Sequence, residues 1–174
     1  GKTKKPTTEM LSEIDILVFD IQDIGVRYYT YLSTLTYIME AAVENKIPLL
    51  ILDRVNPLGR EVRGPMLDLE FASFVGLHPI PVLHGMTMGE LAQMINGEGW
   101  LSNGIMADLT IIPFKGNINQ KVREKAFNPP PSPNMSNLET AWLYQGLCLL
   151  EGANLSEGRG TDLPFKLIGA PWLD

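Results

Sequence analysis

Several short apolar segments of the sequence end in a side chain that can gain or lose a proton. Asp20, Asp53, His84 and Glu151 each end such a segment, and Asp23 lies three residues after the first of them. Carboxylates and imidazoles are common general acids and bases in enzymes. In an open α/β sheet, ligands bind beyond the carboxyl ends of the strands. The pattern therefore predicts a polar site along one edge of a sheet.

Residues 19–31 (FDIQDIGVRYYTY) form the segment that is densest in functional side chains. These side chains are Asp20, Gln22, Asp23, Arg27, Tyr29 and Tyr31. A guanidinium can hold a carboxylate through two parallel hydrogen bonds, and the aromatic rings can stack on a sugar or a base. In an alternative interpretation, Asp20 caps the next turn and Arg27 neutralises Asp23. We favour a binding role, because functional residues concentrate in loops beyond strand ends.

A second dense segment, residues 151–161 (EGANLSEGRGT), combines glycines with charged and amide side chains. Its polar candidates are Glu151, Asn154, Glu157 and Arg159. The glycines allow the backbone to approach a ligand closely. The alternative is a capped surface turn. The serine in this segment has no G-x-S-x-G motif around it, which disfavours a serine hydrolase.

Two further groups have a structural alternative as strong as the functional one. Asp53, Arg54 and Asn56 either line the site or form an ion pair and a turn before a proline. His84 either contacts a ligand near a helix N-terminus, which favours anions, or has a structural role. The spacing of the two histidines does not resemble that of zinc ligands, so we predict no metal-binding residue.

The composition excludes several classes of protein. The 174 residues carry a net charge of −6, which disfavours a nucleic-acid partner because such proteins have a clustered basic face. Cys148 is the only cysteine, so no intrachain disulfide is possible, and its apolar surroundings suggest a small hydrophobic residue. No apolar stretch is long enough to span a membrane, and no signal peptide is present. We expect the chain to be a piece of a longer protein.

Apolar segments alternate with segments of helical periodicity, which predicts a Rossmann-like α/β fold with a mainly parallel sheet and helices on both faces. Strands are expected at residues 14–20, 47–53, 80–84, 107–113 and 146–150. Helices are expected at residues 30–45, 87–96 and 138–144, with another beginning at 164–168. Thr87 should cap the second of these helices, with Glu90 at the capping-box position. The first two strands should be parallel, because a helix-length crossover joins them. No G-x-G-x-x-G motif follows the first strand, so no dinucleotide cofactor is expected.

Five of these segments resemble, in order, a bacterial family of NamZ-type exo-β-N-acetylmuramidases, formerly a domain of unknown function. They are FDIQDIGVRYYTY, LDRVNPLG, PIPVLHGMT with GELA, PPPSPNM and EGANLSEGRGTDLPFKLIGAPW. The resemblance implies release of N-acetylmuramic acid from the non-reducing end of peptidoglycan fragments, in cell-wall turnover and recycling. It also implies a peptidoglycan-derived saccharide as the partner, no cofactor, and a location in the cell envelope, in the periplasm or outside the cell.

The chain departs from this family in extent. Members have an upstream Gly-Pro-Glu-His-Gly segment, whose glutamate is a candidate catalytic acid, and a longer C-terminal domain. We therefore expect residues 1–150 to form a partial Rossmann-like domain, and residues 151–174 to form a motif loop and the start of the C-terminal region. Such a fragment would hold only part of the catalytic apparatus.

The resemblance implies a glycosidase cleft in which two carboxyl groups flank the scissile bond. The candidate catalytic acids are Asp20, Asp23, Glu151 and Glu157. Arg27 or Arg159 would suit the lactyl carboxylate of muramic acid, and Tyr29 and Tyr31 would stack on the sugar ring. His84 and Asn134 would donate or accept hydrogen bonds at hydroxyl or acetamido groups. The other candidate substrate-binding residues are Gln22, Asp53, Arg54, Asn56 and Asn154.

Two other functions stay open from the residues alone. One is a non-catalytic module that binds peptidoglycan or a sugar through the same loops. The other is a magnesium-dependent phosphohydrolase that uses Asp20 and Asp23, which the lack of a phosphate-binding loop disfavours. The oligomeric state, the identity of the acid pair and the stereochemical outcome are also left open.

Overall fold

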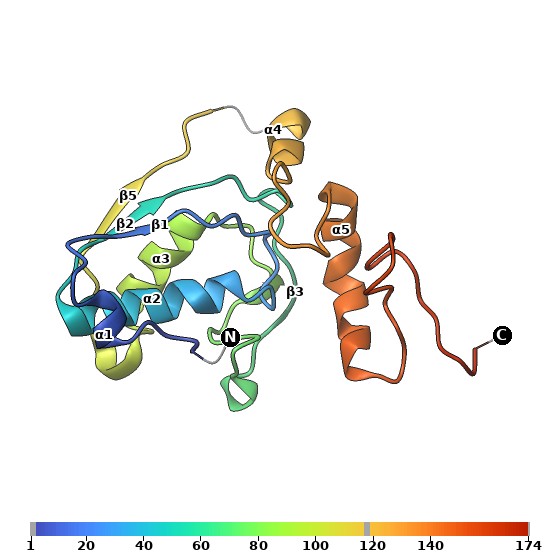
Figure 1. Ribbon diagram of the computed structural model, residues 1–174, viewed down its shortest axis with the longest axis horizontal. Helices are drawn as coiled ribbons and strands as arrows, with labels where there is room; N and C mark the ends of the chain where they lie inside the picture. Colours follow the sequence, from blue (N-terminus) through green and yellow to red (C-terminus); the bar gives the residue numbers. More distant parts are fainter. Residues whose placement is uncertain (1–2, 117–118, 174) are drawn as a thin grey trace.

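The computed structural model describes residues 3–116 and 119–173, which contain a three-stranded parallel sheet (Figure 1). The strands are β1 (Leu17–Phe19), β2 (Leu49–Leu52) and β5 (Leu109–Ile112), in the order β1-β2-β5. Helix α2 (Tyr31–Asn45) connects the first two strands. Their parallel pairing confirms the predicted β-α-β unit.

One face of the sheet is covered by α2 and by α3 (Met88–Gly97), which Figure 1 shows beside each other. Phe19 and Ile51 are fully buried on this face. They belong to one core cluster with Leu35 of α2 and Leu91 of α3. Removing apolar surface from water contributes roughly 25 cal/mol per Å², so this layer is a main source of the domain's stability.

The opposite face of the sheet is open. Val18 is 52% exposed and Ile112 is 49% exposed, and Leu50 and Leu52 between them are only partly buried. Successive residues of a strand point to opposite faces, so these four side chains lie on the face that α2 and α3 do not contact. Within the described residues, the expectation of helices on both faces is therefore correct for one face only.

The segment predicted as the third strand belongs to a separate, two-stranded sheet. Strand β4 (Pro81–Leu83) pairs antiparallel with β3 (Arg63–Met66), while β5 occupies the place beside β2. Pro81 has no N–H to donate, which suits its place as the first residue of β4. His84 therefore follows a strand of a different sheet from the two aspartates after β1 and β2. The prediction that the side chains at the strand ends lie along one edge of a single sheet is therefore wrong for His84.

The C-terminal part of the chain is helical where a strand was predicted. Helix α5 (Leu138–Leu147) extends beyond its predicted end and continues into the 3₁₀ helix η3 (Cys148–Gly152). The predicted strand at residues 146–150 is therefore wrong, because this apolar run continues a helix. The helix expected from residue 164 is also wrong, since turns occupy that segment.

The remaining elements are short. They are α1 (Thr8–Leu11), the 3₁₀ helices η1 (Leu69–Phe71) and η2 (Ser102–Gly104), and α4 (Gln120–Lys125). In the described part of the chain, no helix has the length and apolar character that crossing a membrane requires.

Asp53 binds the N-terminus of α3. Thr87 and Glu90 form the predicted capping box, and Thr87 also donates a hydrogen bond to Asp53 Oδ2 at 2.7 Å. The backbone N–H of Gly89 donates to Asp53 Oδ1 at 2.8 Å. A carboxylate is favoured at the positive end of a helix, so Asp53 joins the end of β2 to α3.

We predict that Gly89→Ala destabilises the protein, because the new Cβ would lie 2.8 Å from Asp53 Cγ and 2.9 Å from Ile111 Cγ2. The free energy of unfolding, measured with urea, should fall by about 1–3 kcal/mol. Gly97→Ala is the control in the same helix, because nothing lies within 4 Å of its Cβ. It should be neutral or stabilising by up to about 1 kcal/mol. Equal losses in both variants would contradict the tight packing of Asp53 on α3.

Candidate active site

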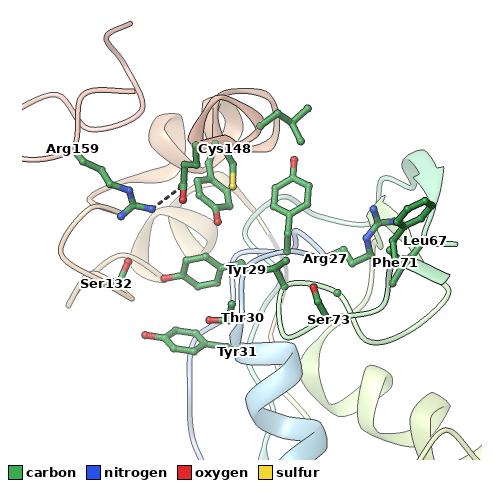
Figure 2. Close-up of a pocket in the computed structure, with 16 residues that line it drawn as sticks. Arg27, Tyr29, Thr30, Tyr31, Leu67, Phe71, Ser73, Ser132, Cys148 and Arg159 are labelled. Atoms are coloured by element: carbon green, nitrogen blue, oxygen red, sulfur yellow. Dashed lines mark hydrogen bonds and ion pairs between the residues drawn. The ribbon is translucent and has the colours of Figure 1, made fainter. Parts of the chain in front are cut away.

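A cavity of about 620 Å³ opens between the loop after β1, the excursion around η1 and the end of α5 (Figure 2). The lining residues that matter here are Arg27, Tyr29, Tyr31, Phe71, Tyr144, Glu151 and Arg159. Figure 2 shows Arg159 and Arg27 toward opposite ends, with Tyr29 between them. The fold thus brings the two dense segments of the sequence to the same cavity.

Aromatic side chains form the central part of this cavity. The Tyr29 ring packs edge-on against Tyr31 and Tyr144, with centroids 5.0 Å and 5.8 Å apart. The Tyr31 hydroxyl donates a hydrogen bond to the Pro131 carbonyl at 2.7 Å. Burial raises the pKa of Tyr29 and of Tyr144, so both phenols are neutral at pH 7. Apolar faces with neutral hydroxyl groups suit a ligand that is partly apolar and partly hydroxylated, such as a sugar.

Arg159 connects two of the predicted catalytic carboxylates. Its Nη2 lies 2.7 Å from Glu151 Oε1, and its Nε lies 2.8 Å from Glu157 Oε1. Glu157 is buried, whereas Glu151 is exposed at the cavity. Of the four predicted catalytic acids, only Glu151 is among the described residues that line this cavity. The buried Glu157 therefore binds the guanidinium away from solvent, and Glu151 faces the cavity.

Asp23 and His84 form a buried pair outside the cavity lining. His84 Nε2 lies 3.7 Å from Asp23 Oδ2, and Gly25 N donates to the same oxygen at 2.6 Å. His84 Nδ1 accepts a hydrogen bond from Met86 N at 3.2 Å, which places the proton of a neutral ring on Nε2. Within the described residues, Asp23 Oδ1 and His84 Nε2 have no hydrogen-bond partner. Buried polar atoms are nearly always paired, so this pair has capacity for a further polar contact.

Asp20 and Arg54 line a smaller cavity of about 250 Å³. Arg54 Nε donates to Asp20 Oδ1 at 2.6 Å, and both side chains are about half exposed. Gln22 also lines this cavity, and its Nε2 donates to the carbonyls of Asp23 and Val55 at 2.6 and 3.0 Å. Asp20 and Asp23 thus have different partners. No three His, Cys, Asp or Glu side chains are grouped to hold a metal ion among the described residues.

The remaining predicted residues lie away from the large cavity. Both oxygens of Asp53 bind the start of α3. Asn56 Nδ2 donates to the Met86 carbonyl at 3.0 Å, and Asn56 Oδ1 accepts from the backbone N–H two residues later at 2.9 Å. Neither Asn134 nor Asn154 is among the residues that line the two cavities described above.

The cavity also contains residues that the sequence did not single out. Phe71 and Val75 form an apolar wall and are 71% and 57% exposed. The sequence feature that could have indicated these two residues is the high apolar content of the long irregular segment that contains them. Tyr144 lies in α5, within a segment predicted to be helical, and Cys148 lies in η3, where a strand was expected. Burial raises the pKa of Cys148 to about 11, so this thiol stays protonated at neutral pH.

Together the sheet and the cavity define an α/β domain of the Rossmann-like class with an aromatic, carboxylate-lined cleft. Residues 1–139 match the family model described as "Exo-beta-N-acetylmuramidase NamZ, N-terminal", and residues 142–174 match that of its C-terminal region. The chain belongs to the NamZ exo-β-N-acetylmuramidase family. This confirms the resemblance seen in the sequence motifs.

Individual relatives support the same assignment. The chain is 53% identical to "Peptidoglycan beta-N-acetylmuramidase NamZ" of Bacillus subtilis (strain 168), over 99% of this chain and 42% of that protein. Two crystal structures of DUF1343 family proteins from Bacteroides fragilis NCTC 9343 are also similar. One has a TM-score of 0.86 and 45% identity, covering 97% of this chain and 47% of that one. The other has a TM-score of 0.83 and 40% identity, covering 100% and 46%. The chain spans less than half the length of these relatives.

We predict that Gly25→Ala disrupts the loop after β1. Gly25 has a φ of +88°, and a Cβ there would lie 2.1 Å from Asn56 Oδ1. Gly160→Ala is the matched control, because φ is +82° and nothing lies within 4 Å of its Cβ. The left-handed backbone should cost about 1–2 kcal/mol in both variants, and the clash should add about 1–3 kcal/mol in Gly25→Ala. Urea unfolding measures the difference, and equal losses would contradict the close contact.

Proposed function

We propose that this chain forms part of the substrate cleft of an enzyme that releases N-acetylmuramic acid from the non-reducing end of peptidoglycan fragments at the cell envelope. The observation that carries the proposal is the cavity, where an ion-paired carboxylate faces aromatic rings in a member of the NamZ family. The Bacillus subtilis relative is named a peptidoglycan β-N-acetylmuramidase. The aromatic rings would hold the sugar by stacking and by hydrogen bonds from their hydroxyl groups.

In this proposal, Glu151 acts on the glycosidic bond from the cavity wall. A carboxylate in this position can accept a proton or stabilise the positive charge that develops on the sugar ring in the transition state. The guanidinium of Arg159 orients it through the 2.7 Å contact. The burial of Asp23 beside His84 suits a positioning role for this pair, which would support the loop that carries the tyrosines.

Glycoside hydrolysis commonly requires a second carboxyl group across the scissile bond. Among the described residues, Glu151 is the only one of the four candidates that lines the cavity. We place the second carboxyl in a part of the longer protein outside residues 1–174, since this chain covers 42% of the Bacillus subtilis relative. The fragment alone would then bind the sugar and leave the bond intact.

The test is hydrolysis of a MurNAc-GlcNAc disaccharide by the intact protein and by residues 1–174, each with and without EDTA. Release of MurNAc by the intact protein alone is the expected result. Release by the fragment as well would show that the second carboxyl lies within it. If neither cleaves but calorimetry detects disaccharide binding, the function is that of a binding module. Activity lost with EDTA and restored by Mg²⁺ would favour metal-dependent chemistry.

Glu151→Gln in the intact protein should lower kcat for this disaccharide by about 100-fold or more, because the amide can neither transfer a proton nor carry the charge. Glu139→Gln is the control, since Glu139 also pairs with a cation, Lys166, but does not line the cavity. It should leave kcat unchanged. A wild-type kcat in Glu151→Gln would remove this residue from the catalytic set.

A further inference from the structure

We infer that Arg27 binds a carboxylate of the ligand in the large cavity and thereby selects muramic acid over glucosamine. The inference rests on the proposed function for the identity of the sugar. Arg27 lines the cavity beside Leu67 and Phe71, at the end away from Arg159 (Figure 2). The sequence left both arginines open for this role, and the structure distinguishes them.

The hydrogen bonds of Arg27 leave one edge of its guanidinium available. Its Nη1 donates to the carbonyls of Pro65 and Ile80, at 2.8 and 2.6 Å. These two bonds use both hydrogens of Nη1. The Nε and Nη2 groups make no hydrogen bond with any of the other described residues. This edge is the one that holds a carboxylate through two parallel hydrogen bonds.

The charge of Arg27 is also unmatched. Among the described residues, no carboxylate lies within 4.0 Å of its guanidinium, whereas Arg159 is paired with both Glu151 and Glu157. Partial burial lowers the pKa of Arg27, which reflects the loss of water around a charge that has no counter-ion. A ligand carboxylate would supply that counter-ion. An anion would bind less favourably at Arg159, because two carboxylates already neutralise the charge of its guanidinium.

The surroundings of Arg27 fit a lactyl group. N-acetylmuramic acid differs from N-acetylglucosamine by a lactyl ether, which carries one methyl group and one carboxylate. Leu67, Phe71 and Val75 provide apolar surface at this end of the cavity, and apolar surface also strengthens a charge interaction by excluding water. The two carbonyl contacts hold the guanidinium in place, so little side-chain entropy is lost when the ligand binds.

The test is calorimetric titration of the intact protein with three sugars: MurNAc, MurNAc with its lactyl carboxylate converted to an amide, and GlcNAc. Wild type should bind MurNAc at least 10-fold more tightly than the other two. Arg27→Gln should weaken MurNAc binding about 10- to 100-fold and leave the two uncharged sugars unchanged. Arg63→Gln, at an exposed arginine of β3 paired with Glu61, is the control and should bind all three as wild type does.

Three results would overturn the inference. In the first, the wild-type protein binds MurNAc and its amide equally. This comparison uses no variant, so it does not depend on whether Arg27→Gln folds. In the second, Arg27→Gln weakens the binding of all three sugars alike, which would show that Arg27 only supports the loops through Pro65 and Ile80. Wild type could fail to bind MurNAc at all. The proposed function fails separately, if the intact protein binds MurNAc through Arg27 but releases none from the disaccharide.

Discussion

The close contact between Gly25 and Asn56 is the constraint on which the arrangement of the site depends. Asn56 follows β2, fits where a side chain on Gly25 would be, and donates to the Met86 carbonyl after β4. One amide therefore connects the loops that follow three strands from two different sheets. Asp23 reinforces the turn by accepting the Gly25 N–H. The tyrosines and Arg27 come directly after this turn, so their positions are determined by it.

The two ends of the large cavity carry opposite charges. At one end, two carboxylates surround Arg159 and leave a net negative group that faces the cavity through Glu151. At the other end, Arg27 is held by neutral carbonyls and keeps its positive charge. Neutral tyrosine hydroxyls lie between them. Such a cavity orients a ligand that has a carboxylate on one side and a reacting bond on the other.

The open face of the sheet is an apolar surface that no other described element covers. Val18 and Ile112 expose apolar side chains at positions that parallel α/β sheets normally bury. The relatives are more than twice as long as this chain. We propose that further segments of the longer protein cover this face, just as we propose that the second carboxyl group of the cleft comes from outside these residues.

The sequence by itself determined the elements that depend on local interactions. The parallel β-α-β unit and the capping box of Thr87 and Glu90 follow from periodicity and from contacts within a few residues, and both were predicted correctly. The apolar run at residues 146–150 was not, because such a run has the same composition in a buried strand and in a helix. Only the tertiary structure decided that β4 leaves the main sheet and which arginine keeps its charge unpaired. These outcomes depend on partners far apart in the chain, whose approach no local pattern of residues specifies.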